Sequence, residues 1–315
     1  MVITDFFKKS VDKNNAKGQP DIGRYEAMVP RFDKDESVAK NLFQICLTLE
    51  GDGTAEEVMQ ILTSEFTNNI ANLKKKNPDY CYRLISNKEA VCFIEKYYGS
   101  AILKYWNRID NTYLAAKADF LRYLLLYALG GIYVDLKSTI DIPLSKTIRD
   151  DDKYLVFYWD NLPNGQHHYL IPEYIKGGEM LQGFIISARG HCFLRSCILN
   201  VMRQIDRYNP YENGVGWQGV LTTTGPALYT RTIYDEIQRC SDTTIYRYGQ
   251  PFNEFGFRLY IAGKYSPGAY QRKLSMTDYR KSSRPVVRCK NPCLQVINVC
   301  WLRILQLYRE RVKLL

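Results

Sequence analysis

Short apolar runs alternate with longer amphipathic segments through the first half of the chain. Residues 42–47 and 80–86 are compact, mostly apolar runs typical of buried strands. Apolar residues in 54–76 recur every three or four positions, as on one face of a helix, and 90–97 repeats that pattern. This strand, helix, strand, helix order predicts an α/β fold with a mostly parallel sheet and right-handed crossovers.

The segment 118–139 joins a helical pattern directly to a strand pattern. Gly130 offers the left-handed stop that ends many helices. On the strand that follows, alternation directs Tyr133, Asp135 and Lys137 to one face and the apolar residues between them to the other. Three residues offer an N-cap for the helix, namely Asp110, Asn111 and Thr112.

The second half of the chain has a weaker pattern. It predicts strands at 154–158 and 183–187 and helices at 192–205 and 227–239. We expect one domain over 38–293, after a loosely ordered lead-in over 1–37. Residues 294–315 form an apolar and basic amphipathic helix pattern, whose apolar face packs on the core or, alternatively, contacts a membrane surface.

Composition narrows the class of protein. The net charge of +10 favours anionic partners, which include nucleic acid, anionic lipid and phosphorylated small molecules. The basic residues are dispersed and no DNA- or RNA-binding motif is present, so no nucleic-acid partner is expected. No apolar run reaches the roughly 18 residues of a membrane span, and the N-terminus lacks the pattern of a secretory signal, so we expect a cytoplasmic protein.

Charged residues gather around the junction of helix and strand. Asp119 and Arg122 are three positions apart and so share one face of the helix, while Asp135 and Lys137 stand at the end of the strand. Ligands of open α/β sheets collect at the carboxyl ends of strands. An ordinary helical salt bridge is the alternative interpretation of Asp119 and Arg122.

A longer motif surrounds these residues and resembles the family 32 glycosyltransferases, sugar-transferring enzymes with a DXD motif that are related to the glucosylating clostridial toxins. The central motif is Ala118-Asp119-x-x-Arg122-Tyr123-x-x-Leu126-x-x-x-Gly130-Gly131-x-Tyr133-x-Asp135. Looser matches are Leu42-Phe43-Gln44, Asn77-Pro78-x-Tyr80, Gln182-Gly183-Phe184-Ile185 and Leu221-Thr222-Thr223-Thr224-Gly225-Pro226.

The resemblance implies a GT-A fold, a nucleotide-sugar donor and transfer with retention at the anomeric carbon. It implies that Asp119 and Arg122 contact the donor sugar and that Asp135 is the first acid of the DXD motif. The residues expected at the donor are Gln44, Asp119, Arg122, Gly130, Gly131, Tyr133, Asp135, Thr224, Gly225 and Pro226. In physical terms, a carboxylate accepts hydrogen bonds from sugar hydroxyls, and a guanidinium orients that carboxylate or reaches a phosphate oxygen.

Lys137 departs from the family pattern because it stands where the second acid of the motif would face a cation. Two outcomes follow. Asp135 holds a divalent metal, Mn²⁺ or Mg²⁺, with ligands from elsewhere, or the Lys137 ammonium meets the phosphates and the metal requirement is reduced or absent. We count Lys137 among the catalytic candidates, with Asp119, Arg122 and Asp135.

The sequence therefore predicts a retaining glycosyltransferase that moves a sugar from a UDP- or GDP-sugar to a glycan, a lipid-linked saccharide or a protein hydroxyl. Trp217, in a glycine-rich stretch, is a weaker candidate for contact with a sugar ring. A catalytically inactive nucleotide-sugar-binding protein of the same fold is the first alternative, and a basic nucleic-acid-binding module is the second. The sequence does not indicate an oligomeric state.

Overall fold

The structure, a computed structural model, describes residues 22–49, 51, 53–159, 178–249, 253–261, 278–289, 299–302 and 304. The helices are α2 (Ile22–Met28), α3 (Ala55–Ile61), α4 (Ser64–Lys76), α5 (Asn87–Arg108), α6 (Leu114–Leu129), α7 (Cys192–Arg207), α8 (Pro210–Asn213), α9 (Gly216–Thr223) and α10 (Pro226–Arg239). Short 3₁₀ turns are η1 (Leu144–Lys146), η2 (Thr243–Ile245) and η3 (Tyr279–Lys281). The strands are β1 (Asn41–Ile45), β2 (Cys81–Ile85), β3 (Gly131–Val134), β4 (Thr139–Ile140), β5 (Tyr154–Val156), β6 (Phe184–Ser187), β7 (Arg247–Tyr248) and β8 (Phe257–Arg258).

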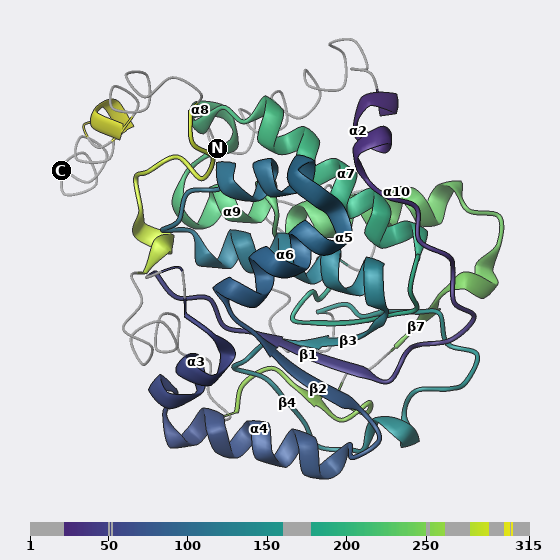
Figure 1. Cartoon of the computed structure of the whole chain (residues 1–315). Coiled ribbons are helices and arrows are strands. Elements are labelled where there is room, and N and C mark those ends of the chain that lie inside the picture. The colour runs from purple at the N-terminus through teal and green to yellow at the C-terminus, as the bar shows by residue number, and fades with distance from the viewer. Residues whose placement is uncertain are drawn as a thin grey trace.

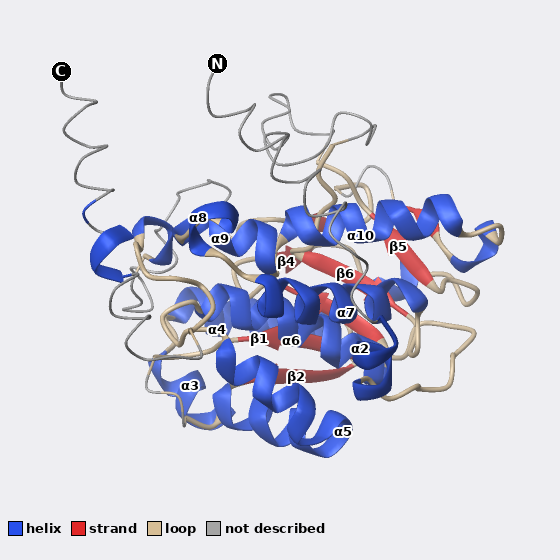
Figure 2. Ribbon diagram, turned by 90° about the horizontal axis from the view of Figure 1, so that it is seen from above, coloured by secondary structure: helices blue, strands red, loops and turns tan. Residues whose placement is uncertain are grey.

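A central sheet separates two layers of helices. Its strand order is β2-β1-β3-β6-β5-β7, and β4 pairs with β8 in a second, two-stranded sheet. Strand β1 is parallel to β2 and β3, whereas β6 is antiparallel to both β3 and β5. Helices α5, α6 and α7 cover one side of the sheet, and α3 and α4 lie on the other (Figure 1, Figure 2). The predicted α/β class with a mostly parallel sheet is confirmed.

Alternate residues of the strands pack into two separate hydrophobic clusters, one on each side of the sheet. Phe43 and Tyr133 pack into the large cluster that includes residues of α5, α6 and α7. Their neighbours Leu42 and Ile132 pack on the opposite side of the sheet, in a cluster with Leu73 of α4. Because both faces are covered, the strands appear in the sequence as continuous apolar runs rather than as alternating ones.

The double glycine lets helix α6 turn into strand β3 within two residues. Gly130 has φ 62° and Gly131 has φ 114°, a region that side chains disfavour. A Cβ on Gly130 would lie 2.7 Å from the amide nitrogen of Arg189, and one on Gly131 would lie 2.6 Å from the carbonyl oxygen of Asn41. Because these backbones approach so closely, helix α6, which holds Asp119 and Arg122, is followed at once by β3 and Asp135.

Several expected boundaries differ from those in the structure. The single helix expected over 54–76 is two helices, α3 and α4, because Leu62 adopts an extended backbone with ψ 137°. The helix expected over 90–97 is the much longer α5, which continues through a kink at Gly99. The N-cap of α6 is Tyr113, rather than any of the three polar residues before it.

The two terminal segments are only partly described. Within the expected lead-in over 1–37, Tyr25 of helix α2 and Val29, just after it, are buried in the large cluster, so packed structure begins earlier than expected. Most of 294–315 lies outside the described residues, and there the expected amphipathic helix stays a prediction. Among the helices in the described ranges, none has the length and apolar character needed to cross a bilayer.

Candidate active site

A cavity of about 280 Å³ opens at the ends of the parallel strands β1 and β3. Helix α6 lines one wall with Asp119 and Arg122, and the turn after β3 lines another with Asp135 and Lys137. The rest of the wall comes from segments far along the chain, including Trp217. Ligands of open α/β sheets bind at this edge, so the cavity lies where the fold predicts a site.

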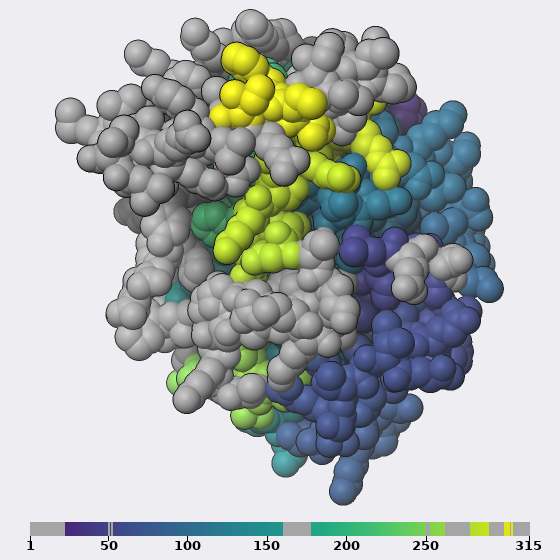
Figure 3. Space-filling view, turned by 90° about the vertical axis from the view of Figure 1, so that its left-hand side faces the viewer, coloured from purple at the N-terminus to yellow at the C-terminus, as the bar shows by residue number. Residues whose placement is uncertain are grey.

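The segment 278–289 packs beside the end of α5 and also contributes to the cavity wall. It runs across the face of the molecule as a yellow-green band between the green helices and the blue N-terminal half (Figure 3). Its main chain bonds to the end of α5, where the Arg288 amide donates to the Arg108 carbonyl at 2.8 Å. It brings Tyr279 and Arg280 of η3 to the cavity wall.

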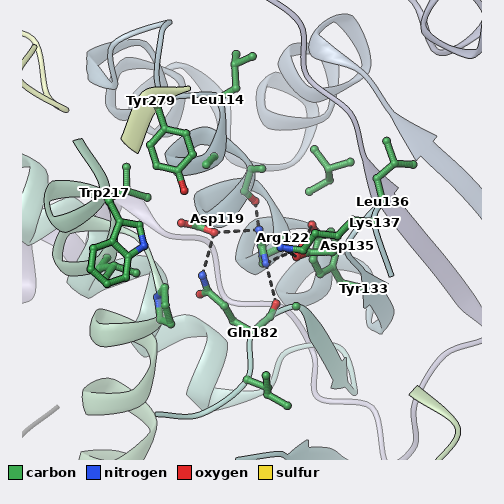
Figure 4. Close-up of a pocket in the computed structure, with 18 of the residues that line it drawn as sticks. Leu114, Asp119, Arg122, Tyr133, Asp135, Leu136, Lys137, Gln182, Trp217 and Tyr279 are labelled. Carbon is green, nitrogen blue, oxygen red and sulfur yellow. Dashed lines mark hydrogen bonds and ion pairs between the residues drawn. The ribbon is translucent and has the colours of Figure 1, made fainter. Parts of the chain in front are cut away.

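Arg122 lies between two carboxylates at the floor of the cavity. Its NH2 is 2.9 Å from Oδ1 of Asp119, and its NH1 is 3.2 Å from Oδ1 of Asp135. All three side chains lie in one row in Figure 4. The guanidinium therefore joins the carboxylate of helix α6 to the carboxylate at the end of β3.

The remaining contacts of Arg122 hold it in place. Its NH1 donates to the carbonyl of Gln182 at 2.7 Å and its Nε to the carbonyl of Ala118 at 3.3 Å. The guanidinium also lies 4.4 Å from the centroid of the Tyr133 ring. Every nitrogen of the guanidinium thus has a protein partner, so Arg122 acts here mainly as an organiser of the two acids.

Asp119 lines the cavity and accepts from three donors. Its Oδ1 accepts from Gln182 Nε2 at 3.0 Å and from Arg122, and its Oδ2 accepts from the Thr224 hydroxyl at 3.2 Å. A carboxylate has about four lone-pair sites, so one is left for a ligand. Burial raises the pKa of Asp119 to about 6, although the charge of Arg122 opposes that change.

Asp135 is surrounded by donors. Its Oδ1 accepts from the Tyr133 hydroxyl at 2.7 Å, and its Oδ2 is 3.3 Å from the Lys137 ammonium. Burial alone would raise the pKa of this carboxyl, but Lys137 and Arg122, with the bond from Tyr133, outweigh it and lower the pKa. Asp135 is therefore held in its charged form.

The sequence-predicted residues divide into two groups. Those that line the cavity are Asp119, Arg122, Tyr133, Asp135, Lys137 and Pro226. Those that do not line it are Gln44, Gly130, Gly131, Thr224 and Gly225. Gln44 donates to the Asp135 main chain and Thr224 to the Asp119 side chain, whereas Gly130 and Gly131 lie at the opposite, N-terminal end of β3 and are wrong as residues of the cavity. Gly225 and Pro226 begin helix α10 beside Asp119.

Several cavity residues were not predicted as site residues, among them Gln182, Glu179 and Tyr279. Gln182 bonds both Asp119 and Arg122, and its place just before β6 in a matched segment was the available signal. Glu179 is buried in the wall, and burial raises its pKa to about 8. Tyr279 arrives from a segment with no regular pattern, so local sequence gave no indication of it.

The donor set around Asp135 does not fit the divalent metal that the resemblance implies. Mg²⁺ and Mn²⁺ prefer several oxygen ligands, usually with more than one carboxylate. Here the guanidinium and the ammonium occupy the sides of Asp135, and Arg122 separates it from Asp119. Over the residues that the structure describes, no group of three or more His, Cys, Asp or Glu side chains is arranged to hold a metal ion.

Comparison with known proteins places this region in a known class of domain. Residues 63–155 match the family model described as the glycosyltransferase sugar-binding region containing DXD motif. This match spans α4 to β5 and includes Asp119, Arg122 and Asp135. Residues 63–155 are thus similar to the sugar-binding region of the DXD-motif glycosyltransferases, and the resemblance drawn from the motifs is confirmed.

Two curated relatives share part of this sequence. An initiation-specific alpha-1,6-mannosyltransferase of Candida albicans is 25% identical over 182 residues, which cover 51% of this chain and 45% of that protein. The Saccharomyces cerevisiae protein of the same description is 40% identical over 70 residues, which cover 22% of this chain and 14% of that protein. The chain therefore spans less than half the length of the curated relatives that it matches.

Two solved structures show broader similarity at low identity. The PaToxG glycosyltransferase has a TM-score of 0.42 and 16% identity, with 86% of this chain and 88% of that chain covered. The UDP-bound glycosyltransferase domain from the YGT toxin has a TM-score of 0.40 and 9% identity, covering 68% and 80% respectively.

Proposed function

We propose that this protein is a glycosyltransferase that moves a sugar from a UDP- or GDP-sugar to a hydroxyl of a glycan, a lipid-linked saccharide or a protein. The observation that carries the proposal is the row of Asp119, Arg122 and Asp135 along one cavity at the strand ends, within the matched sugar-binding region. Because both curated relatives are described as mannosyltransferases, a mannosyl donor is the first to test.

The geometry supports separate positions in the cavity for the donor sugar, the donor diphosphate and the acceptor. The open lone pair of Asp119 accepts a hydrogen bond from a hydroxyl of the donor sugar. We place the donor diphosphate toward Lys137, which lies on the other side of Arg122 from Asp119 (Figure 4). Trp217 and Tyr279 offer aromatic faces on the side away from Lys137 (Figure 4), where we place the acceptor.

We propose that transfer retains the anomeric configuration. The bond between the anomeric carbon and the phosphate oxygen breaks, and a bond from that carbon to the acceptor oxygen forms on the same face. The departing phosphate oxygen takes the acceptor proton. Among the described residues of the cavity, Asp119 and Asp135 are both held in ion pairs with Arg122, which disfavours either carboxylate as base or nucleophile.

The test is release of nucleoside diphosphate from a panel of UDP- and GDP-sugars, GDP-mannose included, with saccharide acceptors. Asp119→Asn and Asp135→Asn should each reduce release by at least about a hundredfold, because both remove a charge that Arg122 orients. Asp141→Asn is the matched control, since Asp141 belongs to an exposed ion pair outside the cavity. Wild-type release that survives both cavity substitutions would refute the proposal, and NMR of the product would test retention.

A further inference from the structure

Lys137 holds its ammonium group at the cavity wall by two contacts. Its Nζ lies 3.3 Å from Oδ2 of Asp135 and 5.6 Å from the centroid of the Tyr260 ring. The side chain is 37% exposed, so the group is anchored but open to the cavity. An ammonium has three N–H donors, and the contact with Asp135 uses one of them.

The balance of charge around the cavity also favours an anion. Among the described residues, three cationic side chains line it, Arg122, Lys137 and Arg280. Three carboxyl groups also line it: Asp119 and Asp135 are both paired with Arg122, whereas Glu179, whose pKa burial raises to about 8, is largely protonated at neutral pH. The cations therefore exceed the paired carboxylates before any ligand enters, and Lys137 is the cation at the position of the missing second acid.

We propose that the Lys137 ammonium takes the place of a divalent metal at the donor diphosphate, so that the protein binds its nucleotide without metal. This inference rests on the proposed function, because it assigns the cation for the diphosphate of that donor. As the sugar leaves, negative charge grows on the phosphate oxygen, and a fixed ammonium stabilises that charge. Asp135 then serves to orient Lys137, through Oδ2, rather than to hold a metal.

Binding of UDP and GDP, measured by isothermal titration calorimetry in EDTA and in Mn²⁺, tests this without any turnover. We expect the wild-type Kd to be the same in both buffers. Lys137→Met should weaken binding about tenfold to a hundredfold, the effect of losing a charged hydrogen bond. Lys146→Met is the control and should bind as the wild type does, because Lys146 is an exposed lysine that does not line the cavity.

Lys137→Asp restores the two acids of the D-x-D pattern and gives a sharper test. In this variant, nucleotide binding should become dependent on Mn²⁺, and electron paramagnetic resonance should detect bound Mn²⁺ that the wild type lacks. Circular dichroism of each variant shows whether it is folded.

The outcomes distinguish failure of this inference from failure of the proposed function. Wild-type binding that EDTA abolishes and Mn²⁺ restores would overturn the role of Lys137 and leave the transferase proposal standing. Unchanged binding by Lys137→Met would overturn it as well. Failure of the wild type to bind either nucleotide in both buffers would reject the proposed donor and, with it, this inference.

Discussion

The side-chain amide of Gln44 donates a hydrogen bond to the main-chain carbonyl of Asp135 at 3.2 Å. Gln44 is completely buried in β1, and its own carbonyl oxygen accepts from the Tyr82 hydroxyl at 3.0 Å. The contact fixes the backbone of Asp135 immediately after β3 ends. Gln44 therefore does not line the cavity, and it positions the Asp135 carboxylate through the main chain.

Gln44→Leu should raise the KM for the donor about tenfold while reducing the free energy of unfolding by about 1–2 kcal/mol. The substitution removes the bond that fixes Asp135, although the Ser138 amide still donates to the same carbonyl at 2.8 Å. Donor KM and urea denaturation together measure the two effects. Tyr82→Phe is the control, because it removes only the hydrogen bond from the Tyr82 hydroxyl to Gln44 and keeps the bond from Gln44 to Asp135. It should leave the donor KM unchanged. Equal changes of KM in both variants would contradict a positioning role.

The contribution of Glu179 to the stability of the protein should fall as pH rises from about 4.5 to 8. Burial raises the pKa of Glu179 from 4.5 to about 8, so over this window the folded protein keeps a proton that the unfolded chain releases. The contribution is greatest at the acidic end and is lost as pH rises through the folded pKa. We expect Glu179 to account for a decrease of about 4 kcal/mol in the free energy of unfolding across the window.

Glu179→Gln replaces the carboxyl with a neutral amide of similar size and should flatten this dependence. Urea denaturation at pH 5, 6, 7 and 8 measures the slope in both proteins. Glu56→Gln, at an exposed position of α3, should keep the wild-type slope. A variant at Glu179 that retains the full wild-type slope would show that the carboxyl ionises normally in the folded protein.

The part of the site that local sequence could predict is the part built by neighbouring elements. Spacing placed Asp119 and Arg122 on one helical face, and strand alternation placed Tyr133 and Asp135 on one side of the strand. The resemblance of the longer motif to a family joined these two pairs into one site. The double glycine likewise indicated a close turn, which the 2.6 Å and 2.7 Å approaches explain.

Contacts between distant segments could not be predicted in this way. The bond from Thr224 to Asp119 joins residues 105 positions apart, and that from Gln182 to Asp119 joins residues 63 apart. The antiparallel direction of β6 is also invisible locally, because a buried strand has the same apolar pattern in either direction. The break at Leu62 was missed because Leu62 is buried and continues the apolar period of the helices on both sides.

Gly131→Ala should destabilise the protein by about 3 kcal/mol, which combines backbone strain with a clash. The φ of Gly131 is 114°, and an added Cβ would lie 2.6 Å from the Asn41 carbonyl oxygen in the neighbouring strand. Gly99→Ala is the matched control, because Gly99 also has positive φ, at 71°, but nothing lies within 4 Å of its Cβ position. Gly99 has ψ −171°, in a region almost restricted to glycine, so strain alone predicts a loss of about 1–2 kcal/mol there. Thermal or urea unfolding measures both, and equal losses would show that the approach to Asn41 relaxes freely.

Trp217→Ala should raise the KM for the acceptor about tenfold and leave the affinity for nucleoside diphosphate unchanged. Trp217 is 41% exposed on α9 and lines the cavity on the side away from Lys137 (Figure 4), where an aromatic face can pack on a sugar ring. Trp301→Ala removes a side chain of similar exposure, 52%, that does not line the cavity, and should change neither constant. Acceptor kinetics and nucleotide titration separate the two steps. A weaker nucleotide affinity with unchanged acceptor KM would move Trp217 to the donor side of the cavity.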